Sequence, residues 1–313
     1  MNKAFIFPGQ GSQYIGMGKD FYDNFQSAKY VIDKLDDVLN YKLSDIIFNG
    51  PADKLSLTIH AQPALMAVSI AILNTIKDQS GKNTNELCNY VAGHSLGEYS
   101  ALASANSISF EDTVKLLHLR GSSMQDAAPI GTGAMAACIG IDIIELEKVI
   151  EQTKENEICD IANDNIQGQI VISGHIGAVD KVINKLNTMG YRAIKLNVSA
   201  PFHCSLMENA EIKMENALNQ TAIHKPTVPI ISNIDASPTE DPGRIRMNLV
   251  KQICSKVRWR ETLNLLEKSQ ISEIVEIGSS KVLTGLAKKA NYTFNRINVG
   301  NIIEFNQFMM GIS

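Results

Sequence analysis

The sequence predicts an α/β fold with a smaller α+β unit inserted into it. Two apolar runs typical of buried strands, Lys3–Phe7 and Asn89–Ala92, are each followed closely by glycine and then by a helical pattern. The same alternation resumes late in the chain, at Val228–Ser232 and Glu273–Ile277. Because strands that alternate with helices favour a parallel sheet, we expect one mainly parallel sheet built from both ends of the chain.

The middle of the chain supplies the elements of the inserted unit. They are a strand at Ala134–Ile141, a helix at Ile144–Thr153, strands at Ile158–Ala162 and Gln169–Ser173, a helix at Gly177–Met189 and a strand at Arg192–Val198. This β-α-β-β-α-β order is that of a ferredoxin-like unit. Residues 127–133 contain one proline and two glycines, which is typical of a hinge. We therefore expect residues 127–198 to form an inserted subdomain, and residues 1–126 and 199–313 to form one discontinuous catalytic domain.

Two long helices are expected in the larger domain. Pro63–Ile76 carries apolar residues at helical spacings with few polar interruptions, which predicts a largely buried helix. Phe110–Gln125 also has a helical pattern. The longest apolar-rich segment, Ala64–Leu73, is well short of the roughly 20 residues of a membrane span. The N-terminus lacks a secretory pattern, so we expect a soluble, cytoplasmic protein.

Composition and charge exclude several classes of partner. The 313 residues carry 29 basic and 33 acidic side chains, and the resulting formal charge of -4 provides no global positive field for nucleic acid or an anionic membrane. The five cysteines form no C-x-x-C pair, and their odd number suits a reducing compartment. The six histidines show no metal-ligand spacing, so we expect no structural metal.

The segment Gly93-His94-Ser95-Leu96-Gly97 matches G-x-S-x-G, the nucleophile elbow of α/β hydrolases. Its glycines permit a sharp strand-to-helix turn that exposes the serine hydroxyl, and the expected strand and helix flank it. This context predicts an α/β-hydrolase-like large domain with Ser95 as nucleophile. An alternative is that Ser95 and Glu98 form an S-x-x-E capping box and only satisfy the first N–H groups of the helix.

A serine nucleophile needs a base, which is normally histidine. Of the six histidines, His203 follows a strand and Pro201, so its ring is expected to project from a loop or helix start. A purely structural histidine is the alternative at this position. The loop Pro8–Gln13 after the first strand fails both glycine-rich phosphate-binding patterns, but Gln10 lies where it can supply a hydrogen-bond donor.

Arg120 interrupts the apolar face of the helix expected at Phe110–Gln125. A buried guanidinium requires an acceptor, and two kinds of acceptor are possible. One is an aspartate or glutamate of the protein, in a structural ion pair. The other is a substrate carboxylate, held by two parallel hydrogen bonds.

Taken together, these segments resemble malonyl-CoA:acyl carrier protein transacylases, the acyltransferases of fatty acid and polyketide synthesis. The resemblance runs in order from residue 3 to about Leu286 and so covers nearly the whole chain. The segments that carry it are Phe7–Gln13, Gly93–Tyr99, Arg120-Gly121, Pro201-Phe202-His203, Val257-Arg258-Trp259, Glu276-Ile277-Gly278 and Lys281–Gly285.

The resemblance implies roles for five residues of the reacting centre. Ser95 would accept the acyl group, and His203 would act as its general base. The oxyanion hole would contain Gln10 and the main-chain N–H of Leu96. Gln252 would orient the histidine through its main-chain carbonyl, in place of the acid of a hydrolase triad.

The resemblance also implies how substrates are held. Arg120 would pair with the free carboxylate of malonate, and His94 and Phe202 would contact the substrate. Phe202 would exclude methylmalonyl groups, and the alternative for it is ordinary packing in the core. Acyl carrier proteins are acidic, so a basic docking patch is needed, and Arg192 and Lys195 are the candidates. Coenzyme A thioesters would be substrates and no cofactor would be bound.

The predicted activity is transfer of malonyl from malonyl-CoA to the phosphopantetheine thiol of acyl carrier protein by a ping-pong mechanism, in a monomeric enzyme that binds neither nucleic acid nor membrane. Two other classes of protein are compatible with the sequence. A serine hydrolase such as a thioesterase would share Ser95 and His203 but would gain nothing from Arg120. A homologue without activity would bind carrier protein and never become acylated.

Overall fold

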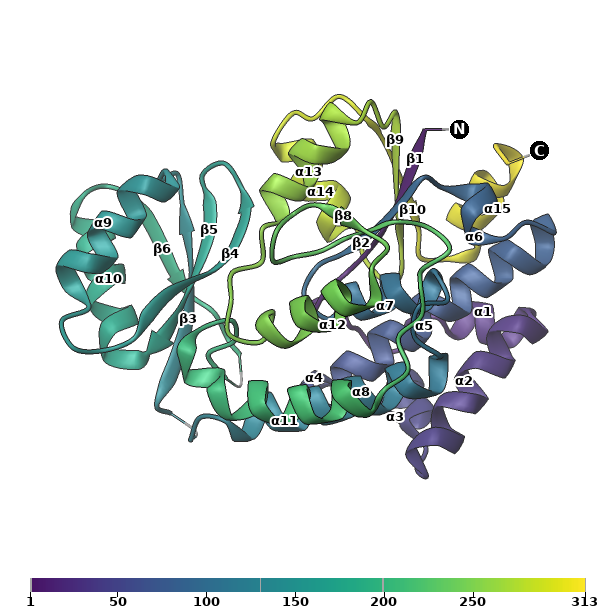
Figure 1. Cartoon of the computed structure of the whole chain (residues 1–313), viewed down its shortest axis with the longest axis horizontal. Coiled ribbons are helices and arrows are strands. Elements are labelled where there is room, and N and C mark those ends of the chain that lie inside the picture. Colours follow the sequence, from purple (N-terminus) through teal and green to yellow (C-terminus); the bar gives the residue numbers. More distant parts are fainter. Residues whose placement is uncertain (1, 130, 199, 313) are drawn as a thin grey trace.

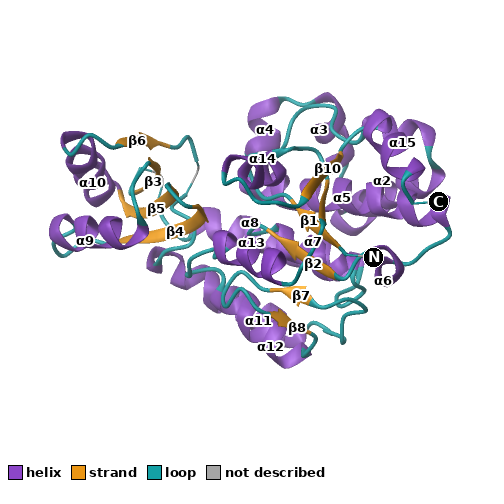
Figure 2. Ribbon diagram, turned by 90° about the horizontal axis from the view of Figure 1, so that it is seen from above, coloured by secondary structure: helices purple, strands orange, loops and turns teal. Residues whose placement is uncertain are grey.

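The computed structural model describes residues 2–129, 131–198 and 200–312. It contains two sheets, which lie in separate lobes (Figures 1 and 2). Ile130, in the predicted hinge, and Ser199, the predicted first residue after the insertion, lie outside the described residues, as do Met1 and Ser313. The domain boundaries therefore stay a prediction.

The larger sheet has six strands in the order β10-β9-β1-β2-β7-β8. They are β1 (Lys3–Phe7), β2 (Tyr90–Gly93), β7 (Ile230–Ile231), β8 (Pro238–Thr239), β9 (Glu273–Ile277) and β10 (Asn295–Val299). All neighbours pair in parallel except β7 and β8, which are antiparallel. The predicted mainly parallel sheet is confirmed. The strand expected at Val228–Ser232 is shorter than predicted, since only two of its residues pair.

Helices cover both faces of this sheet, because successive side chains of a buried strand point to opposite sides. Phe5 and Phe7 of β1 belong to the larger apolar cluster, and Ala4 and Ile6 belong to a second one on the other face. The second cluster is formed with α13 (Trp259–Lys268) and α14 (Val282–Lys289). Most of the remaining helices of this lobe pack in the first cluster. They are α1 (Lys19–Asn24), α2 (Gln26–Leu39), α3 (Leu43–Asn49), α4 (Ala52–Ser56), α5 (Thr58–Ser80), α6 (Thr84–Leu87), α7 (Gly97–Ser104), α8 (Phe110–Asp126), α11 (Glu208–Gln220), α12 (Pro242–Lys251) and α15 (Ile302–Met310).

The helix expected at Pro63–Ile76 is longer than predicted, since α5 begins at Thr58 and ends at Ser80. Pro63 lies in its second turn, where the missing N–H costs the helix one hydrogen bond without ending it. Within the described part of the chain, α5 alone is long and apolar enough to cross a membrane, but most of it is buried inside the protein. Burial against α2 and α8 makes it the central helix of the larger lobe.

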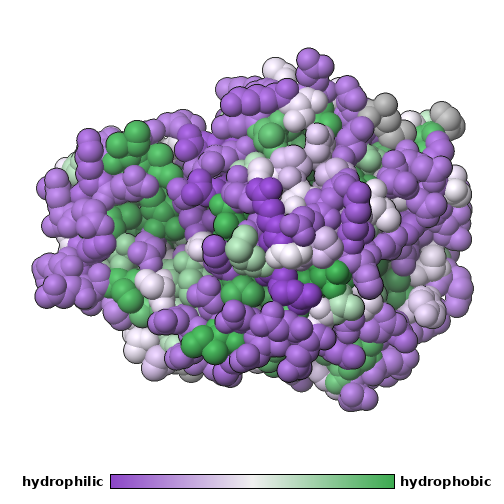
Figure 3. Space-filling model, in the orientation of Figure 1, coloured by the Kyte–Doolittle hydropathy of each residue, from purple (hydrophilic) through white to green (hydrophobic). Residues whose placement is uncertain are grey.

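The smaller sheet is antiparallel, with the strand order β4-β5-β3-β6. Its elements follow the predicted order, as β3 (Gly133–Ile139), α9 (Ile143–Thr153), β4 (Cys159–Ile166), β5 (Gln169–His175), α10 (Ile176–Thr188) and β6 (Arg192–Lys195). The two helices share one apolar cluster with the sheet. The strand expected to end at Val198 ends at Lys195, which is the last of its residues to pair with β3. Hydrophobic side chains gather on this lobe in the face that Figure 3 shows.

Candidate active site

The site lies at the carboxyl ends of neighbouring parallel strands, where open α/β sheets place their ligand sites. The loop after β1 carries Gln10, the turn after β2 carries Ser95, and the loop after β7 carries Asn233. Because β2 pairs with both β1 and β7, these three residues come from adjacent strand ends. The register therefore brings together segments that are far apart in the sequence.

Ser95 occupies a tight turn between β2 and α7, with φ at 55°, in the left-handed region that non-glycine residues rarely adopt. A Cβ on Gly93 would lie 1.9 Å from the carbonyl oxygen of Gly97, and one on Gly97 would lie 2.3 Å from that of Phe7. Glycine is therefore required on both sides of the serine. This is the strand–turn–helix geometry that the G-x-S-x-G pattern predicts.

The capping-box interpretation of this segment is wrong. The Ser95 hydroxyl lies 2.7 Å from Nε2 of His203, and no side-chain hydrogen bond caps α7 among the described residues. The Glu98 carboxylate accepts instead from the main-chain N–H of Asn233 and from Nε2 of Gln252. Both members of the expected box thus have partners outside the helix.

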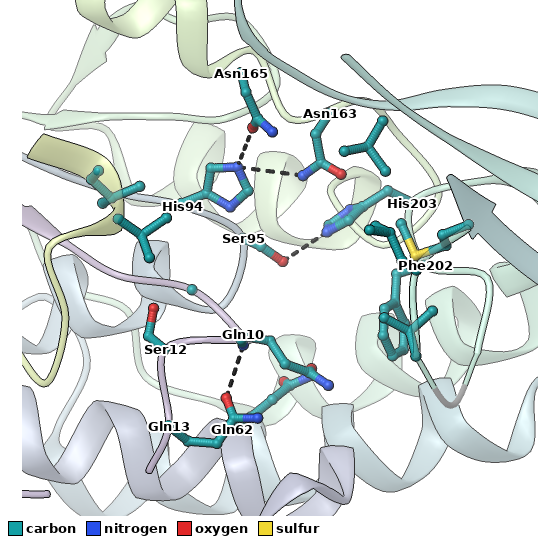
Figure 4. A pocket seen from close by; sticks show the side chains of 18 of the residues that line it. Gln10, Ser12, Gln13, Gln62, His94, Ser95, Asn163, Asn165, Phe202 and His203 are labelled. Carbon is teal, nitrogen blue, oxygen red and sulfur yellow. Dashed lines mark hydrogen bonds between the residues drawn. The ribbon is translucent and has the colours of Figure 1, made fainter. Parts of the chain in front are cut away.

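His203 lies in the loop before η1 (Ser205–Met207), with φ at 59°, and is 3% exposed. Its Nδ1 lies 2.8 Å from the main-chain oxygen of Gln252. A carbonyl oxygen only accepts, so Nδ1 carries the proton of the neutral ring and Nε2 is the acceptor that faces the Ser95 hydroxyl (Figure 4). The serine is therefore aligned to lose its proton to the histidine.

The imidazole of His203 is held in its neutral form. Its pKa is lowered to about 3, chiefly by burial and next by the nearby Arg120 guanidinium, against the raising effect of the hydrogen bond to Gln252. The ring is consequently free to accept a proton throughout the neutral pH range. No carboxylate is needed to fix its tautomer, because the Gln252 carbonyl does so.

Arg120 is 1% exposed on α8 and contacts three oxygen atoms. Nη1 donates to Oε1 of Gln62 at 2.9 Å, and Nη2 donates to Oε1 of Gln252 at 2.9 Å and to Oγ of Ser95 at 3.2 Å. In the described part of the chain, no Asp or Glu oxygen lies within ion-pair distance of it, and its buried Nε has no hydrogen-bond partner. The structural ion pair considered for this residue is therefore absent.

Leu96 and Gln10 are the residues that the family resemblance implies as oxyanion donors. Leu96 immediately precedes α7, and no described residue accepts a hydrogen bond from its main-chain N–H. Gln10 lines the same cavity as Ser95, and its side-chain amide donates to Oγ1 of Thr58. Leu96 thus follows Ser95 directly in the chain, and Gln10 lines the same cavity as Ser95.

The cavity above Ser95 has a volume of about 490 Å³ and lies between the two lobes. The larger lobe contributes the loop after β1, α5, the elbow, α8 and α14, and the smaller one contributes β3, β4, β5 and the segment after β6. Its apolar lining consists of Met124, Met135, Val171, Leu196, Val198, Phe202, Val282, Leu283 and Leu286. Polar side chains converge on the same cavity from both lobes, among them Gln62, Asn163 and Gln169.

His94 joins the two lobes at the wall of the cavity. Its Nε2 lies 2.9 Å from Oδ1 of Asn165 and 3.4 Å from Nδ2 of Asn163, both on β4 (Figure 4). Burial lowers the pKa of His94, so its ring is neutral. Sequence reasoning missed both asparagines, although their spacing of two residues in a strand puts them on one face.

Gln62 and Asn233 were also missed. Gln62 holds Arg120, and Asn233 accepts from the main-chain N–H of Ser95 at 2.7 Å and donates to the oxygen of Gly93 at 2.7 Å. No local pattern marks either residue. Their roles follow from contacts between distant segments.

The predicted basic patch lies apart from the cavity. Lys195, on edge strand β6, forms an ion pair with Asp180 at 2.7 Å, and Arg192 is exposed at the start of the same strand. Neither lines the cavity. Among the residues that the structure describes, no group of three or more His, Cys, Asp or Glu side chains is placed to hold a metal ion.

An α/β protein with a serine elbow at a strand end and a histidine aligned on it belongs, by geometry, to the class of proteins built for acyl transfer to serine. Comparison with known proteins gives the particular family. Residues 4–298 match the model of the acyl transferase domain, and the chain belongs to this acyltransferase family. Its members include two curated relatives named malonyl CoA-acyl carrier protein transacylase. The relative from Bacillus subtilis strain 168 is 43% identical, and the match covers 95% of this chain and 93% of the relative. The relative from Escherichia coli K12 is 39% identical, and the match covers 91% of this chain and 92% of the relative.

Solved structures agree with this assignment. The acyl-carrier-protein-S-malonyltransferase of Bartonella henselae superposes with a TM-score of 0.97 at 47% identity, covering 100% of this chain and 99% of its own. A malonyl-transacylase solved in complex with its type II polyketide synthase acyl carrier protein gives a TM-score of 0.95 at 35% identity, covering 99% and 100%. The likeness thus extends over both lobes.

Proposed function

We propose that this protein transfers the malonyl group of malonyl-CoA to the phosphopantetheine thiol of acyl carrier protein, which supplies malonyl groups to fatty acid synthesis. The proposal rests mainly on the surroundings of the Ser95 hydroxyl, which lies 2.7 Å from Nε2 of His203 and 3.2 Å from Nη2 of Arg120. A nucleophile between a base and a cation suits an acyl group that has its own carboxylate. The names of the relatives support the same activity.

The reaction proceeds in two half-reactions through an ester of Ser95. The Ser95 hydroxyl gives its proton to Nε2 of His203 while Oγ attacks the thioester carbonyl. The carbon–sulfur bond then breaks, and the coenzyme A thiolate takes the proton from His203. In the second half-reaction the carrier thiol gives its proton to His203, its sulfur attacks the ester, and Oγ regains a proton as it leaves.

The tetrahedral intermediates carry negative charge on the former carbonyl oxygen, which needs hydrogen-bond donors. The main-chain N–H of Leu96, at the start of α7, is the donor we assign first, with Gln10 beside it. Gln252 keeps His203 in the required tautomer through its main-chain oxygen at 2.8 Å. The apolar part of the cavity lining supports transfer in preference to hydrolysis.

Selectivity for malonyl rests on Arg120, whose fork can hold a carboxylate by two parallel hydrogen bonds. An acetyl group would leave that buried cation without its charged partner. Phe202, which lines the cavity and is 8% exposed, narrows the space beside the base and so disfavours methylmalonyl. His94 supports the substrate from the opposite wall, where Asn165 fixes its ring.

At the level of the fold, we propose an α/β-hydrolase-like catalytic domain with an inserted ferredoxin-like subdomain over residues 127–198. The elbow after β2 supports the first description, and the strand order β4-β5-β3-β6 with two helices on one face supports the second. All five cysteines are free thiols, which suits a reducing, cytoplasmic compartment. We also propose a monomer, because Ser95, His203 and Gln252 come from one chain, and, as the family resemblance implies, no bound cofactor.

Arg192 and Lys195 are the residues we propose for contact with the acidic carrier protein. Both lie on the strand that leads through 196–198 to the cavity, so a carrier docked there would have its arm close to the entrance. The Lys195–Asp180 pair must open or be shared on docking. The two cations would act by steering and orienting the carrier.

Intact-mass analysis tests the activity. After mixing with malonyl-CoA we expect a malonyl adduct on the wild-type chain, which is lost on addition of holo carrier protein and appears on the carrier. The Ser95→Ala variant is the matched control and should show no adduct. An adduct that disappears in buffer without carrier would make the protein a thioesterase, and a chain that never becomes acylated would be a binding protein without activity.

A further inference from the structure

Glu98 is a buried carboxylate beside the reacting centre that the transfer mechanism does not use. It lies on α7, three residues after Ser95, and is 2% exposed. Its Oε2 accepts from Nε2 of Gln252 at 2.6 Å and from the main-chain N–H of Asn233 at 3.1 Å. A buried charge is costly, so a carboxylate kept at this position needs an explanation in the function of the site.

The first partner of Glu98 is oriented by it. Gln252 points Nε2 toward Glu98 and Oε1 toward Nη2 of Arg120 at 2.9 Å. A carboxylate only accepts hydrogen bonds and a guanidinium only donates them, so one of the two orientations of the amide satisfies both neighbours. Glu98 and Arg120 therefore fix Gln252 from opposite ends.

The fixed amide acts on both reacting residues. Nε2 of Gln252 also donates to the main-chain oxygen of Ser95 at 3.1 Å, and the main-chain oxygen of Gln252 accepts from Nδ1 of His203. Gln252 follows the last residue of α12, so its side chain anchors the end of that helix to the elbow. The spacing of the serine and the histidine thus depends on the bond that Glu98 accepts.

The second partner of Glu98 reaches the elbow by another route. Asn233 donates its main-chain N–H to Glu98, while its side chain accepts from the N–H of Ser95 at 2.7 Å and donates to the oxygen of Gly93 at 2.7 Å. Asn233 therefore holds the turn at Ser95 by two hydrogen bonds, and Glu98 in turn holds Asn233. Two links therefore lead from one carboxylate to the nucleophile, and they meet where Nε2 of Gln252 lies 3.4 Å from Oδ1 of Asn233.

Charged and titratable groups face Glu98 from each neighbouring element. Arg120 comes from α8, Asp235 comes from the loop after β7, and Tyr99 is adjacent on α7. The pKa of Glu98 is raised to about 7, chiefly by burial and to a smaller extent by Asp235, against the lowering effect of its hydrogen bonds. Its charge therefore changes in the neutral range, whereas the pKa of His203 is far lower.

We propose that Glu98 is a positioning residue for acylation, whose ionised carboxylate orients Gln252 and Asn233 and thereby aligns His203 and Ser95. In its ionised form it also balances the Arg120 guanidinium across the amide of Gln252 while the site is empty. The inference rests on the proposed malonyl transfer. It assigns no contact between Glu98 and the substrate.

Two variants separate geometry from charge. Glu98→Gln keeps an oxygen in place and removes the charge, whereas Glu98→Ala removes both. The readout is the single-turnover rate of Ser95 acylation by malonyl-CoA, measured by quenched intact mass from about pH 5.5 to about pH 8.5. Asp36→Asn is the matched control, because Asp36 is a buried carboxylate on α2 that accepts from Ser44 and does not line the cavity.

For the wild type and Asp36→Asn we expect an acylation rate that rises with pH, is half-maximal near about pH 7 and levels off above about pH 8. Glu98→Gln should remain at the low-pH level of the wild type throughout, and Glu98→Ala should be slower by about 10- to 100-fold with an unchanged KM for malonyl-CoA. A Glu98→Gln profile that superimposes on the wild type would overturn the proposal, even if Glu98→Ala does not fold. A wild type that malonyl-CoA never acylates would refute the proposed function instead.

Discussion

Replacing Arg120 with alanine removes the cation that faces the nucleophile. The guanidinium is 1% exposed, with Nη1 held by Gln62 and Nη2 by Gln252 and Ser95. A malonyl carboxylate bound there would gain charge-assisted hydrogen bonds worth about 1.5–3 kcal/mol each. Without the cation the carboxylate would be buried and unpaired, at a cost of about 3–5 kcal/mol.

That cost sets the expected size of the effect. Since about 1.4 kcal/mol corresponds to a tenfold change in rate, malonylation of Ser95 should slow by roughly 10²- to 10⁴-fold. Acetylation should be spared or improved, because acetyl has no carboxylate and the substitution removes a cation that lowers the pKa of His203. The ratio of the two acylation rates therefore reports the role of Arg120 directly.

The assay is single-turnover acylation with malonyl-CoA and with acetyl-CoA at saturating concentration, read as intact mass. Arg120→Lys is the matched variant, since it keeps the charge but loses the planar fork, and it should recover part of the malonyl rate. The loss of a donor to Gln62 and Gln252 is expected to lower stability, so unfolding must be measured alongside. An equal loss of malonyl and acetyl transfer would refute the assigned role.

Three further predictions concern the elbow, the buried acid and the docking patch. Gly97→Ala should lower the free energy of unfolding in urea by at least about 2 kcal/mol, because its Cβ would lie 2.3 Å from the carbonyl oxygen of Phe7; an unchanged midpoint would contradict the close approach. Burial raises the pKa of Glu98 from 4.5 to about 7, so its ionisation lowers wild-type stability as the pH rises through that range. The free energy of unfolding of Glu98→Gln, relative to that of the wild type, should therefore increase by about 3 kcal/mol between about pH 4 and about pH 8. A difference between the two proteins that is the same at every pH, measured by urea unfolding, would exclude this. Replacing Arg192 and Lys195 with glutamate should raise the KM for carrier protein while the first half-reaction with malonyl-CoA keeps its rate, and an unchanged KM would place the docking surface elsewhere.

Local sequence patterns were sufficient wherever the determining interactions are local. The strands Lys3–Phe7 and Glu273–Ile277 have the predicted bounds, because apolar runs between turn residues specify buried strands. The turn at Ser95 was predictable for the same reason, since the glycines that permit it lie two residues away on either side. The ends of α5 were not, because tertiary burial extends that helix beyond Pro63.

The sequence by itself determined the α/β class, the order of elements in the smaller lobe and the identity of the serine and its histidine as candidates. Only the tertiary structure decided what Arg120 and Glu98 contact. Arg120 meets Gln62 and Gln252 across 58 and 132 residues of chain, and Glu98 meets Gln252 across 154. Such contacts arise from the pairing of parallel strands and the packing of helices on them, and no periodicity in the chain records which buried polar groups will meet.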